Sequence, residues 1–194
     1  GLEATLRSLR DAGVYVTFEE LKGREPMVRH GQTFEATTDD FANPLLSRAY
    51  QSESGGSTGA RTRVGQDLDH LAMQAAHFML GFDAHGVLDS PHAIWRGVLP
   101  DGSGINNVLR AGRFGRVPVK WFSPRRPRDP KPPLRFRLAT YGTVVIGRAV
   151  GVALPWPESV PIDQGIVVAR WAVDTVRRHG SCLVSTAVSR ALRV

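Results

Sequence analysis

Residues 54–63 read Ser-Gly-Gly-Ser-Thr-Gly-Ala-Arg-Thr-Arg, and the interpretation of the whole chain starts from this decapeptide. Its glycines let the backbone approach a bound group closely, while its hydroxyl groups and two arginines supply donors and positive charge. Such a composition is typical of a phosphate-binding loop and also of a mobile Gly/Ser surface linker; the arginines and the helix that follow directly favour the phosphate loop. The next residues, 66–81, predict a helix whose N-terminal dipole would favour an anion at the end of the loop.

The segments around the decapeptide predict an α/β fold. Residues 47–53 predict a strand that leads into the loop, 105–111 a helix and 117–122 another strand. Strands that alternate with helices are typical of a mostly parallel sheet flanked by helices. We therefore expect a single α/β unit over residues 1–194.

The remaining segments predict further elements of the same kind. Helices are expected over 2–12, 18–21, 134–152 and 164–179, a β-prone run over 14–17, a loop or edge strand over 32–40, a strand over 182–186 and the start of a helix at 187–194. For 134–152 a strand stays possible because of its Val-Val-Ile run and glycines. Asp163 is expected to cap the helix over 164–179, and Gly180 to end it. Residues 123–133, rich in proline and arginine, predict an exposed loop.

The spelling of the decapeptide resembles one enzyme superfamily. A Walker A loop is excluded because Ala60 stands where a glycine is required and no lysine follows. The run Gly-Gly-Ser-Thr-Gly at 55–59 is instead similar to the Ser-Gly-Thr-Thr-Gly core of adenylate-forming enzymes, and most similar to the branch of phenylacetate-CoA ligases and acyl-protein synthetases. In that family the loop holds the β- and γ-phosphates of ATP while a carboxylate attacks the α-phosphorus.

The resemblance implies a function and a set of binding residues. It implies an ATP- and Mg²⁺-dependent ligase that activates a carboxylic acid, with coenzyme A or a carrier-protein thiol as a possible acceptor. The implied phosphate-binding residues are Ser54, Gly55, Gly56, Ser57, Thr58, Gly59, Arg61, Thr62 and Arg63. The two arginines stand where the family has a lysine. The family's adenine-binding and ribose-binding motifs and its catalytic lysine have no counterpart before Val194, so the resemblance implies the N-terminal part of a longer enzyme.

Residues 91–104 follow the predicted loop and helix, and two readings of them stay open. His92 and Trp95 beside a turn form part of an acyl pocket in one reading, by position in the resembled family. Core packing is the default for Trp95 in the other.

Composition and charge set the alternative function. The net charge of +7 permits a noncatalytic basic module that binds nucleic acid or an acidic protein. The arginines are spread along the chain, however, which argues against nucleic acid. Cys182 is the single cysteine, so an internal disulfide is excluded. The sequence contains no long apolar run and no signal segment, and we expect a cytoplasmic protein that does not enter a membrane.

Overall fold

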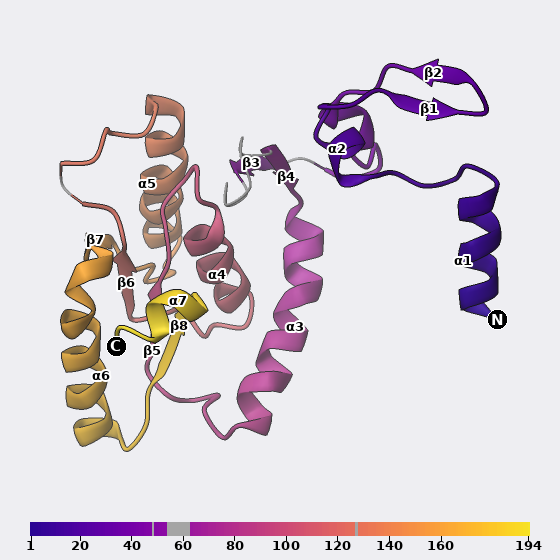
Figure 1. Ribbon diagram of the computed structural model, residues 1–194. Coiled ribbons are helices and arrows are strands. Elements are labelled where there is room, and N and C mark those ends of the chain that lie inside the picture. The colour runs from indigo at the N-terminus through magenta and orange to yellow at the C-terminus, as the bar shows by residue number, and fades with distance from the viewer. Residues whose placement is uncertain (48, 54–62, 127) are drawn as a thin grey trace. The chain divides into compact units, whose positions relative to one another are not determined.

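A sheet of four parallel strands, in the order β7-β6-β5-β8, forms the centre of the fold (Figure 1). Its strands are β5 (His92–Trp95), β6 (Lys120–Ser123), β7 (Pro157–Ser159) and β8 (Leu183–Thr186). In the register of the sheet, Trp95 lies opposite Phe122 on one side and Thr186 on the other. The computed structural model describes residues 1–47, 49–53, 63–126 and 128–194. It confirms the expected α/β class.

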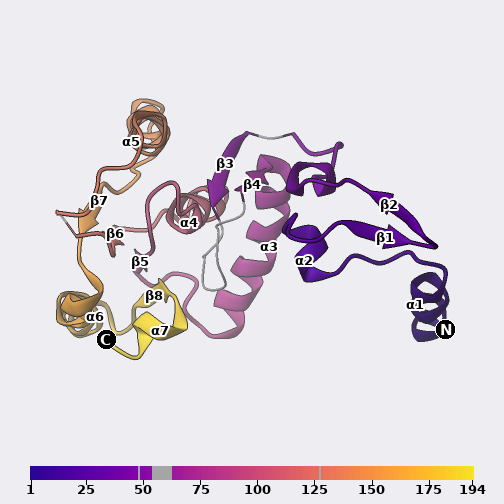
Figure 2. The ribbon, with the colours of Figure 1, turned by 45° about the horizontal axis from the view of Figure 1, so that its top comes forward.

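Helices cover both faces of the sheet (Figure 2). On one face, α4 (Ser103–Gly112) and α5 (Leu134–Ala149) pack on Ile94 and Trp121. On the other, α6 (Gly165–His179) packs on Trp95 and Phe122 through Val168. This division follows from the alternation of side chains along each strand, since neighbouring residues point to opposite faces. The two inner strands, β5 and β6, are buried over most of their length, as expected for a parallel sheet covered on two sides.

A two-stranded hairpin and two further helices also belong to the larger part of the chain. The strands β3 (Tyr50–Glu53) and β4 (Arg63–Gln66) form an antiparallel pair, and α3 (Leu68–Ala84) follows them and packs against α4. The short helix α7 (Val188–Ala191) follows β8. Among the residues described, no helix combines the length and the apolar composition that a bilayer crossing requires.

The structure corrects several local predictions. Residues 92–95 are the inner strand β5, and Trp95 is fully buried in the core, as core packing predicts. Residues 14–17 form no strand. The helix α6 receives no side-chain cap: its N-cap residue is Gln164, and Asp163 lies in a 3₁₀ turn (Ile162–Gln164), where its carboxylate is paired with Arg126 at 3.1 Å. Gly180 does end α6, in the left-handed conformation that glycine tolerates best.

The chain divides into two compact units, Gly1–Leu46 and Ser47–Val194, where the sequence led us to expect one. The sheet belongs to the second unit. The first contains α1 (Leu2–Asp11), α2 (Phe18–Leu21), the hairpin β1 (Met27–Arg29) and β2 (Gln32–Phe34), and a 3₁₀ turn (Thr38–Phe41).

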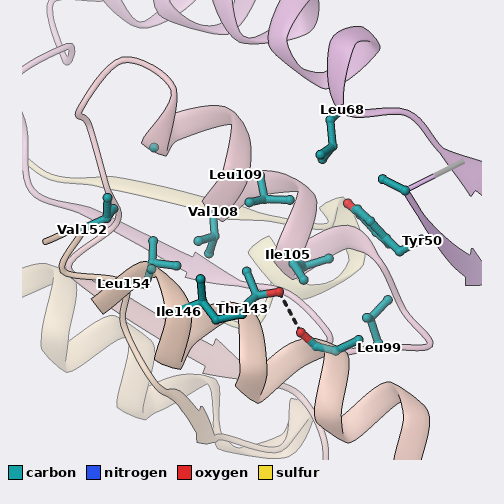
Figure 3. A pocket seen from close by; sticks show the side chains of 14 residues that line it. Tyr50, Leu68, Leu99, Ile105, Val108, Leu109, Thr143, Ile146, Val152 and Leu154 are labelled. Atoms are coloured by element: carbon teal, nitrogen blue, oxygen red, sulfur yellow. Dashed lines mark hydrogen bonds between the residues drawn. The ribbon is translucent and has the colours of Figure 1, made fainter. Parts of the chain in front are cut away.

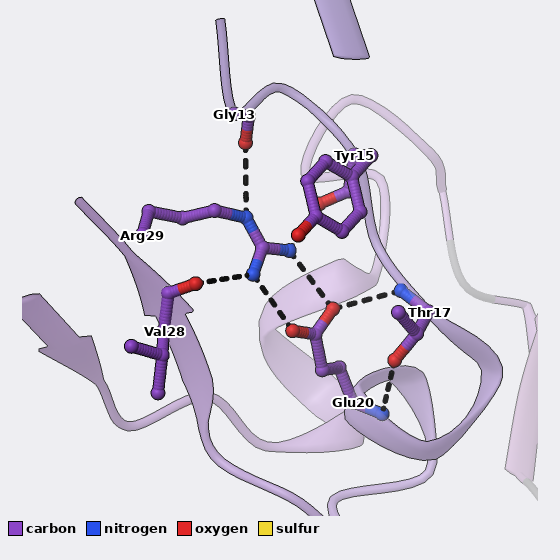
Figure 4. Close-up of polar contacts among 6 residues, drawn as sticks. All are labelled: Gly13, Tyr15, Thr17, Glu20, Val28 and Arg29. Carbon is purple, nitrogen blue, oxygen red and sulfur yellow. Dashed lines mark hydrogen bonds and ion pairs between the residues drawn. The ribbon is translucent and has the colours of Figure 1, made fainter. Parts of the chain in front are cut away.

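A buried ion pair joins the helix and the hairpin of this first unit (Figure 4). The guanidinium of Arg29 donates to both carboxylate oxygens of Glu20, at 2.8 and 2.9 Å. Glu20 also accepts from the backbone N–H of Thr17, whose hydroxyl accepts from the N–H of Glu20, so the pair includes a capping box. The hydrogen bonds from Arg29 and Thr17 lower the pKa of Glu20 to about 2.

Candidate functional site

The hairpin of β3 and β4 carries the predicted phosphate loop between its two strands. Glu53, the last residue of β3, lies opposite Arg63, the first residue of β4. The two residues that flank 54–62 are therefore held side by side. Backbone hydrogen bonds of the β ladder, rather than side-chain contacts, hold these two residues together.

The end of the hairpin is fixed to the loop that follows β5. The backbone N–H of Glu53 donates to the carbonyl oxygen of Pro100 at 2.8 Å. Ser52 is buried against Gly102, where an added Cβ would come within 2.5 Å of the Ser52 Cβ. Glycine at 102 is thus required for this close approach. Because this loop starts at the carboxyl end of β5, the hairpin end lies at the edge of a parallel sheet where ligands bind in α/β proteins.

A chain of polar side chains joins the hairpin to α4. The hydroxyl of Tyr50 donates to Asn106, whose amide donates to the side-chain oxygen of Gln66 at 3.0 Å. Gln66 in turn donates to the hydroxyl of Ser52 at 3.0 Å. Burial raises the pKa of Tyr50 to about 12, so its hydroxyl stays protonated and keeps donating. The network fixes both strands of the hairpin relative to α4.

The structure places one of the predicted phosphate-binding residues. Arg63 lies exposed at the start of β4. The others lie outside the described residues; they are Ser54, Gly55, Gly56, Ser57, Thr58, Gly59, Arg61 and Thr62.

The expected contribution of the following helix is corrected. The helix α3 begins at Leu68, after β4, so it does not start at the end of the loop. Its first free N–H groups, those of Asp69 and His70, are capped by the carboxylate of Asp67 at 2.7 and 3.0 Å. Because that carboxylate already occupies the positive end of the helix, these N–H groups are not available to bind a phosphate.

An apolar cavity of about 520 Å³ lies beside the hairpin, between α4 and α5 (Figure 3). Its walls are almost entirely aliphatic, and the polar groups at its surface include the hydroxyls of Tyr50 and Thr143. Thr143 donates to the carbonyl of Ala139, one turn earlier in α5, so its hydroxyl is satisfied within the helix. A volume of this size suits a small organic molecule. Neither His92 nor Trp95, the residues expected at an acyl pocket, lines it.

Neither this cavity nor the polar network was predicted from the sequence. The apolar spacing of Ile105, Val108 and Leu109 on α4 was a signal that one face of this helix is buried, but not that the space beside it stays open. Cys182 is half-buried, and burial raises the pKa of its thiol, which does not favour a nucleophilic thiolate.

In the parts of the chain described, no group of three or more His, Cys, Asp or Glu side chains is arranged to hold a metal ion. The geometry thus offers a hairpin end at the carboxyl edge of the sheet and an apolar cavity next to it. No protein family, no curated protein and no solved structure matches this chain.

Proposed function

We propose that this chain is the N-terminal part of an ATP-dependent ligase that activates a carboxylic acid as an acyl-adenylate, and that residues 54–63 bind the phosphates of ATP. The observation that supports this most is the anchoring of the hairpin. Glu53 and Arg63, which flank the glycine-rich segment, are paired through their main chains, and the bond from Glu53 to Pro100 holds this end of the hairpin beside the carboxyl edge of the sheet.

The residue types of the loop fit this chemistry. Attack of the substrate carboxylate on the α-phosphorus forms a new P–O bond and releases pyrophosphate, so negative charge builds up on the leaving group. Hydroxyl donors from Ser54, Ser57, Thr58 and Thr62 and amides of the glycines can stabilise that charge. Arg61 and Arg63 supply the positive charge for which the family uses a lysine, and Mg²⁺ accompanies the nucleotide in the complete enzyme.

The apolar cavity supports an acid with an apolar body. It lies beside β3, which leads into the loop, and it is lined by Leu99 from the segment that anchors the hairpin. A cavity with aliphatic walls favours an alkyl or aromatic acyl group over a polar one. The final acceptor of the acyl group is coenzyme A or a carrier-protein thiol, and we propose a cytoplasmic location.

The test is ATP–pyrophosphate exchange by the complete enzyme, measured with a panel of aliphatic and aromatic acids. The double variant Ser57→Ala, Thr58→Ala is expected to reduce acid-dependent exchange by about 100-fold or more, because each donor aimed at the leaving group contributes strongly. The exposed Ser8 on α1 offers a matched control, and Ser8→Ala should exchange normally.

Unchanged exchange in the double variant would refute the assignment of the loop. An absence of exchange with every acid, together with tight and salt-sensitive binding of DNA or RNA, would refute the ligase and favour the noncatalytic basic module.

A further inference from the structure

The strand order creates a switch point between β5 and β8. From β5 the chain passes through α4 to β6 and through α5 to β7, moving outward with both helices on one face. It then returns through α6, on the opposite face, to place β8 on the other side of β5. In open α/β sheets, the crevice outside the carboxyl ends of the two strands at such a reversal is where ligands bind. The residues that end these strands are Trp95 and Thr186.

Two arginines meet at the switch point. Arg96 directly follows β5, and Arg190 lies in α7, just after β8. Each reaches across to the other strand: Arg96 Nη2 donates to the carbonyl of Thr186, and Arg190 Nη1 donates to the carbonyl of Trp95 at 3.1 Å. The two guanidinium groups are therefore held next to each other by the last residues of neighbouring strands.

The charge of this pair is not neutralised by the residues around it. Neither arginine forms an ion pair within the described chain, and the Nε atom of each is buried without a hydrogen-bond partner. A buried donor without a partner is unfavourable, and more so when it is charged. Burial, and then the like charge of Arg190, lower the pKa of Arg96, whereas Asp101 raises it. The charge of Arg96 also lowers the pKa of Arg110, so three guanidinium groups interact here with the single carboxylate of Asp101, and positive charge is in excess.

We propose that Arg96 and Arg190 bind the carboxylate group of a small organic acid at the β5–β8 switch point. The guanidinium fork matches the two oxygens of a planar carboxylate, whose negative charge offsets part of the local positive excess. This inference rests on the proposed function for the identity of the acid, which is then the substrate. The site also adjoins the hairpin, because Arg96 begins the loop in which Pro100 accepts from Glu53.

The direct test follows the Nε–Hε signals of the arginines by ¹H–¹⁵N NMR while benzoate is added to the chain. The signals of Arg96 and Arg190 should shift in a saturable way, and inorganic phosphate should bind at least tenfold more weakly. Arg96→Lys and Arg190→Lys identify the two signals and should each weaken benzoate binding about tenfold or more, because lysine keeps the charge but loses the fork. Arg177→Lys is the matched control, since Arg177 is an exposed arginine of α6, and it should bind benzoate as the wild type does.

Several outcomes would overturn the proposal. They are the absence of saturable shifts with benzoate and with acetate, phosphate binding as tight as benzoate binding, or an equal loss in the control. Circular dichroism of each lysine variant checks that the fold is retained, and Arg96→Lys provides a second reading if the Arg190 variant unfolds.

A kinetic arm separates this inference from the phosphate loop. In the complete enzyme, the arginine variants should raise the KM for the acid and leave the KM for ATP unchanged, and an unchanged KM for the acid would refute the site. If the loop assignment fails instead, the Ser57 and Thr58 variants exchange normally while benzoate still shifts both arginine signals.

Discussion

The buried imidazole of His92 is expected to make the stability of the sheet depend on pH below neutrality. His92 begins β5, is only 7% exposed, and its Nε2 lies 2.9 Å from the hydroxyl of Ser185 in β8. The Phe82 ring packs against it in a T-shaped arrangement, with ring centroids 5.8 Å apart. Burial disfavours the imidazolium and lowers the pKa of His92 from 6.5 to about 4.

The size and sign of the effect follow from this shift. Between these two pKa values the unfolded chain binds a proton that the folded chain does not, so the free energy of unfolding falls as the pH falls from 6.5 towards 4. Each unit of pKa difference is worth about 1.4 kcal/mol, so His92 should remove about 2.5 kcal/mol between about pH 7.5 and pH 4.5. That is a large share of the roughly 5–15 kcal/mol by which domains are stable.

The assay is urea unfolding followed by tryptophan fluorescence at several pH values, for the wild type and for His92→Gln. Glutamine can still bond to Ser185 but does not titrate, and all other histidines are common to both proteins. The difference between the two unfolding free energies should therefore change by about 2.5 kcal/mol over the stated range. Parallel pH curves for the two proteins would refute the argument.

Three further perturbations test other parts of the structure. Gly104→Ala places a Cβ against a backbone carbonyl and an indole ring, so urea unfolding should show a destabilisation of about 1–3 kcal/mol. On the same helix, a Cβ at Gly112 meets open space, so Gly112→Ala should stabilise the fold by about 0.5–1 kcal/mol. The opposite order of the two stabilities would refute the packing at α4. Gly102→Ala should push the hairpin off its anchor and cut acid-dependent exchange by the complete enzyme at least tenfold with the fold retained, and full activity would contradict the anchoring. In the wild type, the first unit should lose stability as the pH falls from 4.5 towards 2, because the carboxylate partner of Arg29 becomes protonated. Glu20→Gln should remove this pH-dependent loss, as measured by amide exchange in this unit. An acid response equal to that of the wild type would argue against the ion pair.

The helices and the class of the fold could be predicted from the sequence because their signals are local. An apolar residue every three or four positions is enough to indicate α4 and α6, and Gly180 ends α6 where its permissive backbone is needed. The strand β8 was expected for a similar reason, since residues 182–186 are a short run rich in β-branched and apolar side chains.

The two strands that position the site could not be predicted in this way. The strand β4 reads Arg-Val-Gly-Gln, a composition without strand preference, and it forms because it pairs with β3 across the glycine-rich segment. The strand β5 is buried at all four positions, so it lacks the alternation that marks a strand with one wet face. Its histidine and tryptophan suggested a ligand pocket, whereas pairing on both sides makes it the centre of the sheet.

The anchoring of the hairpin and the arginine pair depend on contacts between distant parts of the chain. Nothing near Glu53 in sequence indicates its bond to Pro100, and nothing near Arg96 indicates that Arg190 lies beside it. Asp163 shows the reverse case: its local signal for a helix cap is sound, but the chain forms a 3₁₀ turn there and the N-cap residue of α6 is Gln164.

The pairing of β5 with β8 has a consequence for folding during synthesis on the ribosome. Trp95 and its partner Thr186 are 91 positions apart, and loop closure over such a span is slow. During synthesis, the edge of β5 that pairs with β8 therefore stays unpaired until nearly the whole described chain has been translated. In that interval the nascent chain presents an aggregation-prone edge, and chaperone dependence would be greatest there.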